Sequence, residues 1–227
     1  MNSMGAAAMP GYERLLRTMA AAAIVGGPLG YLVGGLLAPA IHGSGTSTLE
    51  ANASAAPATN AVHLVAFVVA SFLLPVGAAA LAYLAYHRTP WLATVAGLLG
   101  VLGWLPFSAL AALDDLASTM AHLPDSGSSA ALLDAFTNDG VMSTYLIVYI
   151  VCHLVGYVLL GIALRRSRVI PLWAAVAMVA SSPLTIAAFA FHGSGRTAVG
   201  VAALALLLIG SVPGVPVIIA PRRAVAS

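Results

Sequence analysis

Apolar positions run almost continuously along this 227-residue chain, and short polar stretches interrupt them at intervals. A helix that crosses a bilayer needs about 20 mostly apolar residues. Six segments meet this requirement, and they are residues 18–41, 61–86, 91–112, 143–164, 171–191 and 197–220. The pattern therefore predicts an all-α protein, an integral membrane bundle of six transmembrane helices.

The predicted organisation is one membrane domain with short ends. Residues 1–17 form a cytoplasmic N-terminal segment, residues 18–220 form the six-helix transmembrane domain, and residues 221–227 form a cytoplasmic tail. Six prolines fall inside the predicted helices, and they are Pro28, Pro75, Pro106, Pro183, Pro213 and Pro216. Because neighbouring helices can re-satisfy the carbonyl groups that proline leaves free, we expect kinks rather than breaks.

The few charged residues predict the orientation of the bundle. The chain is 61% hydrophobic and only 7% charged, whereas a soluble domain has about 25% charged residues, so the bilayer must be its solvent. Eight of the nine arginines lie on one side of a six-span arrangement, and six of the seven acidic residues lie on the other. Because cytoplasmic loops carry an excess of basic residues, both termini are predicted to be cytoplasmic. A net charge of +2 is too small to indicate a nucleic-acid partner.

Two longer connections are expected on the outer side. The first spans residues 43–60 and is rich in Ala, Ser and Thr, and the second spans residues 113–141. Within the second, residues 129–136 are expected to form a surface helix whose Leu132, Leu133 and Phe136 dip into the membrane interface.

Three glycines at four-residue spacing, Gly26, Gly30 and Gly34, lie on one face of the first predicted helix. Small residues at this spacing let another helix backbone approach closely. The neighbour is either another helix of the same bundle, which we favour, or a partner membrane protein or second copy of this chain.

The tetrapeptide HGSG occurs twice, at residues 42–45 and 192–195, and each copy follows a long apolar run. Glycine is preferred just after a helix, and histidine in a last turn can donate to free carbonyl groups. We therefore interpret both copies as helix ends. The G-x-S-x-G element of serine hydrolases is absent from the sequence.

Polar residues expected at the same outer depth form a candidate metal site. The candidate ligands are His42, His63, His192, Asp114 and Asp115. Histidine and carboxylate groups together suit zinc or copper. Two carboxylates predicted at a helix C-terminus would also need a cation to offset the helix dipole. The alternative is a set of polar caps at the membrane interface, wetted by water and headgroups.

His153 is expected near the middle of the bilayer, and Tyr149 lies one helical turn before it. An ionisable group at this depth is a functional candidate because its charged form is costly to bury. The two residues could form a proton relay or a small-molecule or cofactor pocket, or His153 could hydrogen-bond to a neighbouring helix. No second histidine is expected at the same depth, which argues against a bis-histidine haem.

Residues 153–175, HLVGYVLLGIALRRSRVIPLWAA, place an arginine-bearing turn, a proline and a tryptophan after an apolar helix. This stretch resembles the uncharacterised polytopic membrane proteins of high-GC bacteria, a family of unknown function. The use of arginine without lysine fits such a genome. The resemblance implies a bacterial inner-membrane location and transfers no functional residue.

From the sequence, the leading hypothesis is a non-enzymatic role in ligand binding, sensing or support of a partner protein. The alternatives are a metal-dependent membrane enzyme or redox protein with an outward His/Asp site, and a small transporter.

The metal hypothesis predicts that His42→Ala and His192→Ala each reduce the metal bound to the protein. Elemental analysis of detergent-purified protein without a histidine tag measures this content. An unchanged metal content in either variant would remove that histidine from the ligand set.

Overall fold

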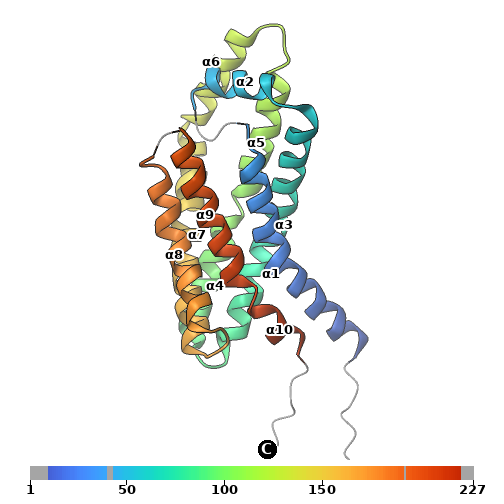
Figure 1. Ribbon diagram of the computed structural model, residues 1–227, viewed down its shortest axis with the longest axis vertical. Coiled ribbons are helices and arrows are strands. Elements are labelled where there is room, and N and C mark those ends of the chain that lie inside the picture. The colour runs from blue at the N-terminus through green and yellow to red at the C-terminus, as the bar shows by residue number, and fades with distance from the viewer. Residues whose placement is uncertain (1–9, 40–42, 192, 221–227) are drawn as a thin grey trace, which may run out of the picture.

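The computed structural model describes residues 10–39, 43–191 and 193–220. Within these residues the chain forms ten α-helices and no β-strand (Figure 1). The helices are α1 (Gly11–Leu37), α2 (Gly45–Ser54), α3 (Pro57–Tyr86), α4 (Pro90–Trp104), α5 (Phe107–Met120), α6 (Ser126–Thr137), α7 (Gly140–Arg166), α8 (Leu172–Ala188), α9 (Gly193–Ser211) and α10 (Gly214–Ile219). The predicted all-α class is confirmed.

Five helical segments of the described chain are long and apolar enough to cross a membrane. They are Gly11–Leu37, Pro57–Tyr86, Pro90–Met120, Gly140–Arg166 and Gly195–Ile219, and α8 is a shorter apolar helix of 17 residues. The exterior of these helices is also apolar, since side chains such as Phe72 and Val65 are more than 60% exposed. Such an exterior requires lipid around it, and the chain is therefore a membrane protein.

The helices form an elongated bundle with two different ends (Figure 1). At one end α2 and α6 form a small cap, and we call this the cap end. At the other end lie the start of α1, α10 and the arginine-bearing turns after α3 and α7, and we call this the arginine end. Arg17 donates to the carbonyl groups of Ile218 (3.4 Å) and Ala220, which ties α1 to α10. Both ends of the described chain therefore lie at the arginine end.

Small residues hold the helices at close range. A Cβ added to Gly30 of α1 would lie 2.9 Å from the Ala66 carbonyl oxygen on α3, and a Cβ added to Gly26 would meet Leu73 at 2.9 Å. Gly34 of α1 likewise lies against Phe67 of α3. The predicted glycine face thus packs on α3 of the same chain, which is the intramolecular alternative, and partner binding stays a prediction.

The prolines behave in two ways. Pro28, Pro75 and Pro183 lie inside continuous helices, as expected. Pro106 lies between α4 and α5, and Pro213 lies between α9 and α10, so the expectation of kinks alone is wrong at these two positions. Both residues keep nearly helical backbone angles, so each interruption is a short turn between two helices.

The two connections predicted on the outer side are more ordered than expected. The first contains α2 and the second contains α6, and the two helices share a second hydrophobic core at the cap end. That core consists of Leu49, Ala117, Met120, Ala130 and Leu133. Leu133 therefore packs inside the cap instead of facing the interface, whereas Leu132 and Phe136 are exposed.

The HGSG copies begin helices, which corrects the interpretation as helix ends. The Ser44 side chain accepts from the Ser47 backbone N–H, and the Gly45 N–H donates to Asp134 Oδ1 at 2.6 Å. Both contacts satisfy the free amides at the start of α2. The second copy opens α9 at Gly193. His42 and His192 lie outside the described residues.

Close contact between α4 and α7 predicts that Gly103→Ala destabilises the fold. A Cβ at this position would overlap the backbone of His153, and such overpacking costs roughly 1–3 kcal/mol. Thermal unfolding in detergent should show a lower midpoint for Gly103→Ala. Gly140→Ala is the matched control because a Cβ there meets nothing within 4 Å. Equal midpoints for the two variants would refute the close contact.

Candidate functional site

An aromatic cluster occupies the interior of the bundle toward the cap end. It contains Tyr31 of α1, His63 and Phe67 of α3, Trp104 of α4, Phe107 of α5, and Tyr149, His153 and Tyr157 of α7. Neighbouring ring centroids are 4.5–6.1 Å apart, which is the range of favourable aromatic pairs. Five helices thus contribute side chains to one cluster.

His153 lies near the middle of α7 and is 5% exposed. Its Nδ1 contacts the Tyr149 carbonyl oxygen of its own helix, and no hydrogen bond from His153 to a neighbouring helix is present among the described residues. Because a carbonyl oxygen only accepts, Nδ1 must carry the hydrogen, and Nε2 of the neutral ring keeps a lone pair. The ring also packs on Trp104 and Tyr149, with centroids 4.7 and 4.5 Å apart.

Tyr149 connects α7 to α1. Its hydroxyl lies 2.5 Å from the hydroxyl of Tyr31, so one of the two groups donates to the other. Both Tyr149 and Tyr157 are buried, whereas Tyr145 is 46% exposed. Since residues at four-residue spacing drift around a helix, Tyr145, one turn before Tyr149, no longer lies on the buried face. His153 and Tyr149 are therefore neighbours in one site, as the sequence indicated.

His63 and Asp114 come together at the cap-side edge of the cluster. His63 Nδ1 lies 2.8 Å from the Gly34 carbonyl oxygen of α1, and Nε2 lies 3.7 Å from Asp114 Oδ2. The His63 side chain is 3% exposed and the Asp114 side chain 45% exposed. The pair therefore has a buried half on α3 and an accessible half on α5.

Asp114 and Asp115 are not at a helix end, because α5 continues to Met120. The argument that a cation must offset the helix dipole at these carboxylates is thus wrong. Asp115 is exposed, one position further around the helix. Among the described residues no three His, Cys, Asp or Glu side chains gather as metal ligands. His42 and His192 are outside these residues, and the metal site stays a prediction.

Several separate polar contacts lie between the cap and His153, and together we call them the polar seam. Its members are Asn52, Asn60, Ser118, His63, Asp114, Tyr31, Tyr149 and His153. At its cap end, Asn60 Nδ2 donates to Ser118 Oγ at 2.7 Å and to Asn52 Oδ1 at 3.4 Å. The Oδ1 atom of Asn60 is buried and makes no hydrogen bond with the described residues.

The seam ends halfway through the bundle. Between His153 and the arginine end, the described buried polar groups are the Tyr157 hydroxyl, one turn beyond His153, and serines such as Ser167 and Ser211. Each of these serines donates to a carbonyl group of its own helix. The surrounding core consists of Leu81, Leu160, Leu164 and alanines. No polar route toward the arginine end is therefore present among the described residues.

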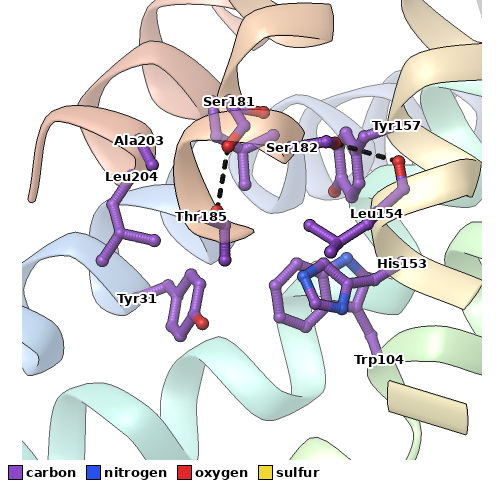
Figure 2. A pocket seen from close by; sticks show the side chains of 11 residues that line it. Tyr31, Trp104, His153, Leu154, Tyr157, Ser181, Ser182, Thr185, Ala203 and Leu204 are labelled. Carbon is purple, nitrogen blue, oxygen red and sulfur yellow. Dashed lines mark hydrogen bonds between the residues drawn. The ribbon is translucent and has the colours of Figure 1, made fainter. Parts of the chain in front are cut away.

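A small cavity lies at the inner end of the seam, between α1, α4, α7, α8 and α9 (Figure 2). Figure 2 shows Thr185 between Tyr31 and the paired rings of His153 and Trp104. Ser181 and Ser182 of α8 complete the polar part of the wall. The free volume is about 10 Å³, which is close to what a single water molecule needs. A haem or quinone cannot enter without displacing these helices.

Tyr31, Trp104 and the α8 hydroxyl groups were not predicted from the sequence. Tyr31 follows Gly30 directly and lies on the face that packs on α3. A polar aromatic residue within a glycine-rich face is the signal that could have located it. Trp104 and Ser182 carry no such signal, because their place in the site depends on how α4 and α8 meet α7.

Comparison with models of protein families, with curated proteins and with solved structures gives no match to this chain. The function must therefore be argued from the geometry of the seam and the cavity.

The contact between the two tyrosine hydroxyls predicts that Tyr149→Phe destabilises the protein by about 1 kcal/mol, because one buried hydrogen bond is lost. Tyr145→Phe removes a hydroxyl from the exposed position one turn away and should leave stability unchanged. Thermal unfolding of both variants in detergent measures the difference. If Tyr145→Phe costs as much as Tyr149→Phe, the buried contact does not stabilise the fold.

Proposed function

We propose that this protein binds and senses a small polar ligand within a six-span membrane bundle, and that it catalyses no reaction. The proposal rests on one observation: the polar contacts of the seam lie between the cap and a small cavity lined by Tyr31 and His153, and among the described residues they do not continue to the arginine end. A binding protein needs access to its site from one side only. A transporter needs a second polar route to the other side.

The proposed orientation places the cap outside a bacterial cytoplasmic membrane and both termini in the cytoplasm. The described arginines support it, because Arg14, Arg17, Arg88 and those around Ser167 lie at the arginine end, and basic residues favour the cytoplasmic side. Arg196 is the exception, and it lies over the Phe189 ring at 5.1 Å near the start of α9. The resemblance of residues 153–175 to bacterial polytopic membrane proteins agrees with this location.

The cap could transmit the binding of a ligand in the cavity to a partner protein outside the bundle. Asn60 of α3 bonds to Asn52 of α2 and Ser118 of α5, so the first polar contacts of the seam join the cap to the bundle. A ligand that alters the packing of α1, α3 and α5 would shift these contacts as well. A partner protein that reads the cap is the accessory role in this proposal.

The metal-dependent alternative retains one favourable observation, the approach of His63 and Asp114. It needs at least one further ligand from His42 or His192. The metal analysis of the His42→Ala and His192→Ala variants decides this alternative.

Binding predicts that at least one class of small polar solute raises the thermal unfolding midpoint of the detergent-purified protein, because a ligand that binds only the folded state stabilises it. The panel contains amines, short carboxylates, amides, alcohols and amino acids. His153→Leu should abolish the rise, and Tyr145→Phe should retain it. A panel without any stabilising class would overturn the proposal. Solute flux in proteoliposomes would instead support a transporter.

A further inference from the structure

The turn that follows α7 has an arginine at a position where glycine is preferred. Its hydrogen bonds are those of a Schellman motif. The Val169 N–H donates to the Leu164 carbonyl oxygen at 2.9 Å, and the Arg168 N–H donates to the Arg165 carbonyl oxygen at 3.0 Å. Arg168 has a φ of 59°, and no other described non-glycine residue has a positive φ. Glycine would form the same turn without this strain, so backbone geometry alone does not explain an arginine here.

Four exposed arginines gather at the two turns of this end, and we call them the arginine cluster. They are Arg88 in the turn after α3, and Arg165, Arg166 and Arg168 at and just after the end of α7. Arg88 donates to the Ser167 carbonyl oxygen at 3.4 Å, which joins the two turns. Residues 80–100 and 155–180 contain no acidic residue, and Glu13, at the start of α1, pairs with Arg17. The cluster therefore has no counter-charge among the described residues.

Two exposed tryptophans mark the depth of the cluster in the membrane. Trp91 and Trp173 lie in the first turns of α4 and α8 and are 85% and 57% exposed. Gly100 meets Gly156 in the antiparallel contact of α4 with α7. Trp91 and Arg165 are each nine residues further along, so they lie at the same level. Because tryptophan prefers the boundary between hydrocarbon and headgroups, the cluster lies at the depth of the lipid phosphates.

Two helix starts add to the positive potential at this end. The helices α4 and α8 begin at Pro90 and Leu172, directly after the two turns, and no side chain caps either start. The first amides of a helix lack partners within it and carry the positive end of the helix dipole. Both starts lie at the arginine end of the bundle (Figure 1), and their N–H groups add to the attraction of the guanidinium groups for an anion.

We propose that the arginine cluster binds one anionic phospholipid, with the phosphate on the guanidinium groups and the glycerol and upper acyl chains against Trp91. This inference goes beyond the proposed ligand-binding function and does not depend on it. A guanidinium group binds a phosphate through two parallel N–H···O bonds. A zwitterionic lipid also brings an ammonium group, which the cluster repels. Inorganic phosphate matches the arginines but has no apolar part for the tryptophan.

The test counts lipids on the detergent-purified protein by native mass spectrometry. The protein is titrated with phosphatidylglycerol and, separately, with phosphatidylcholine that has the same acyl chains. We expect a saturable complex with one phosphatidylglycerol and several-fold weaker binding of phosphatidylcholine. Equal affinities for the two lipids would overturn the inference. Displacement of the lipid by an equal concentration of inorganic phosphate would also overturn it, because the site would then bind free phosphate.

Two double variants separate the cluster from net charge. Arg165→Gln/Arg168→Gln removes two charges from the cluster, and Arg14→Gln/Arg196→Gln removes two charges elsewhere. Because one basic residue near a lipid surface contributes about fivefold to binding, the cluster variant should bind phosphatidylglycerol roughly 25-fold more weakly. The control should bind it as the unchanged chain does. An equal loss in both variants would mean that net charge alone attracts the lipid, and the inference would fail.

Arg168→Gly separates lipid binding from the stability of the turn. Glycine relieves the left-handed strain, so the thermal unfolding midpoint in lipid-free detergent should rise while phosphatidylglycerol binding falls several-fold. Arg166→Gln is the matched control, because it removes a charge from the cluster within regular helix and should weaken binding without raising the midpoint. Unchanged lipid binding in Arg168→Gly, or a lower midpoint, would contradict the inference.

Discussion

Close approach of helix backbones is the constraint on which this structure depends. Lipid removes the hydrophobic drive between helices, so van der Waals contact at short range must hold the bundle together. Gly30 meets α3, Gly103 meets His153, and Gly156 lies where a Cβ would be 2.7 Å from the Gly100 nitrogen. These contacts also fix the site, because α4 and α7 lie close enough for Trp104 to pack on His153. The polar seam exists where this packing brings α1, α3, α5 and α7 together.

Within that packing, hydrogen-bond direction determines what the interior can do. The Tyr149 and Gly34 carbonyl oxygens fix the tautomers of His153 and His63 through their Nδ1 hydrogens. Both rings therefore present Nε2 away from the carbonyl group that orients them. The serines nearer the arginine end, such as Ser211, donate their hydroxyl hydrogen to a carbonyl oxygen of their own helix. Polar groups there bond within one helix, whereas Asn60 and Tyr149 of the seam bond between helices.

Much of the fold follows from the sequence, because apolar length and arginine placement are local signals. The predicted segments correspond to the membrane-length helices and α8, and Tyr149 and His153 are neighbours as their spacing indicated. The errors also have physical reasons. The sequence predicted a helix end at Asp114 and Asp115. The helix α5 continues past them because α2 and α6 pack on its last turns, at Ala117 and Met120. The sequence did not predict α2, because its residues are mostly polar. Its start is stabilised by Ser44 and by Asp134, which is distant in the sequence. The cavity depends on α8 meeting α7, and no local pattern encodes that contact.

The apolar half of the bundle near the arginine end has an energetic consequence for a cell. Membranes store work as an ion gradient, and a continuous polar path through a protein would discharge it. Here the leucine and alanine layer around Leu160 and Leu164 separates His153 from the arginine end. Beyond His153, the described residues around Leu160 and Leu164 offer a proton no chain of polar side chains along which to continue. Such a layer lets polar groups lie in the cap half of the bundle without a path that would discharge the membrane potential.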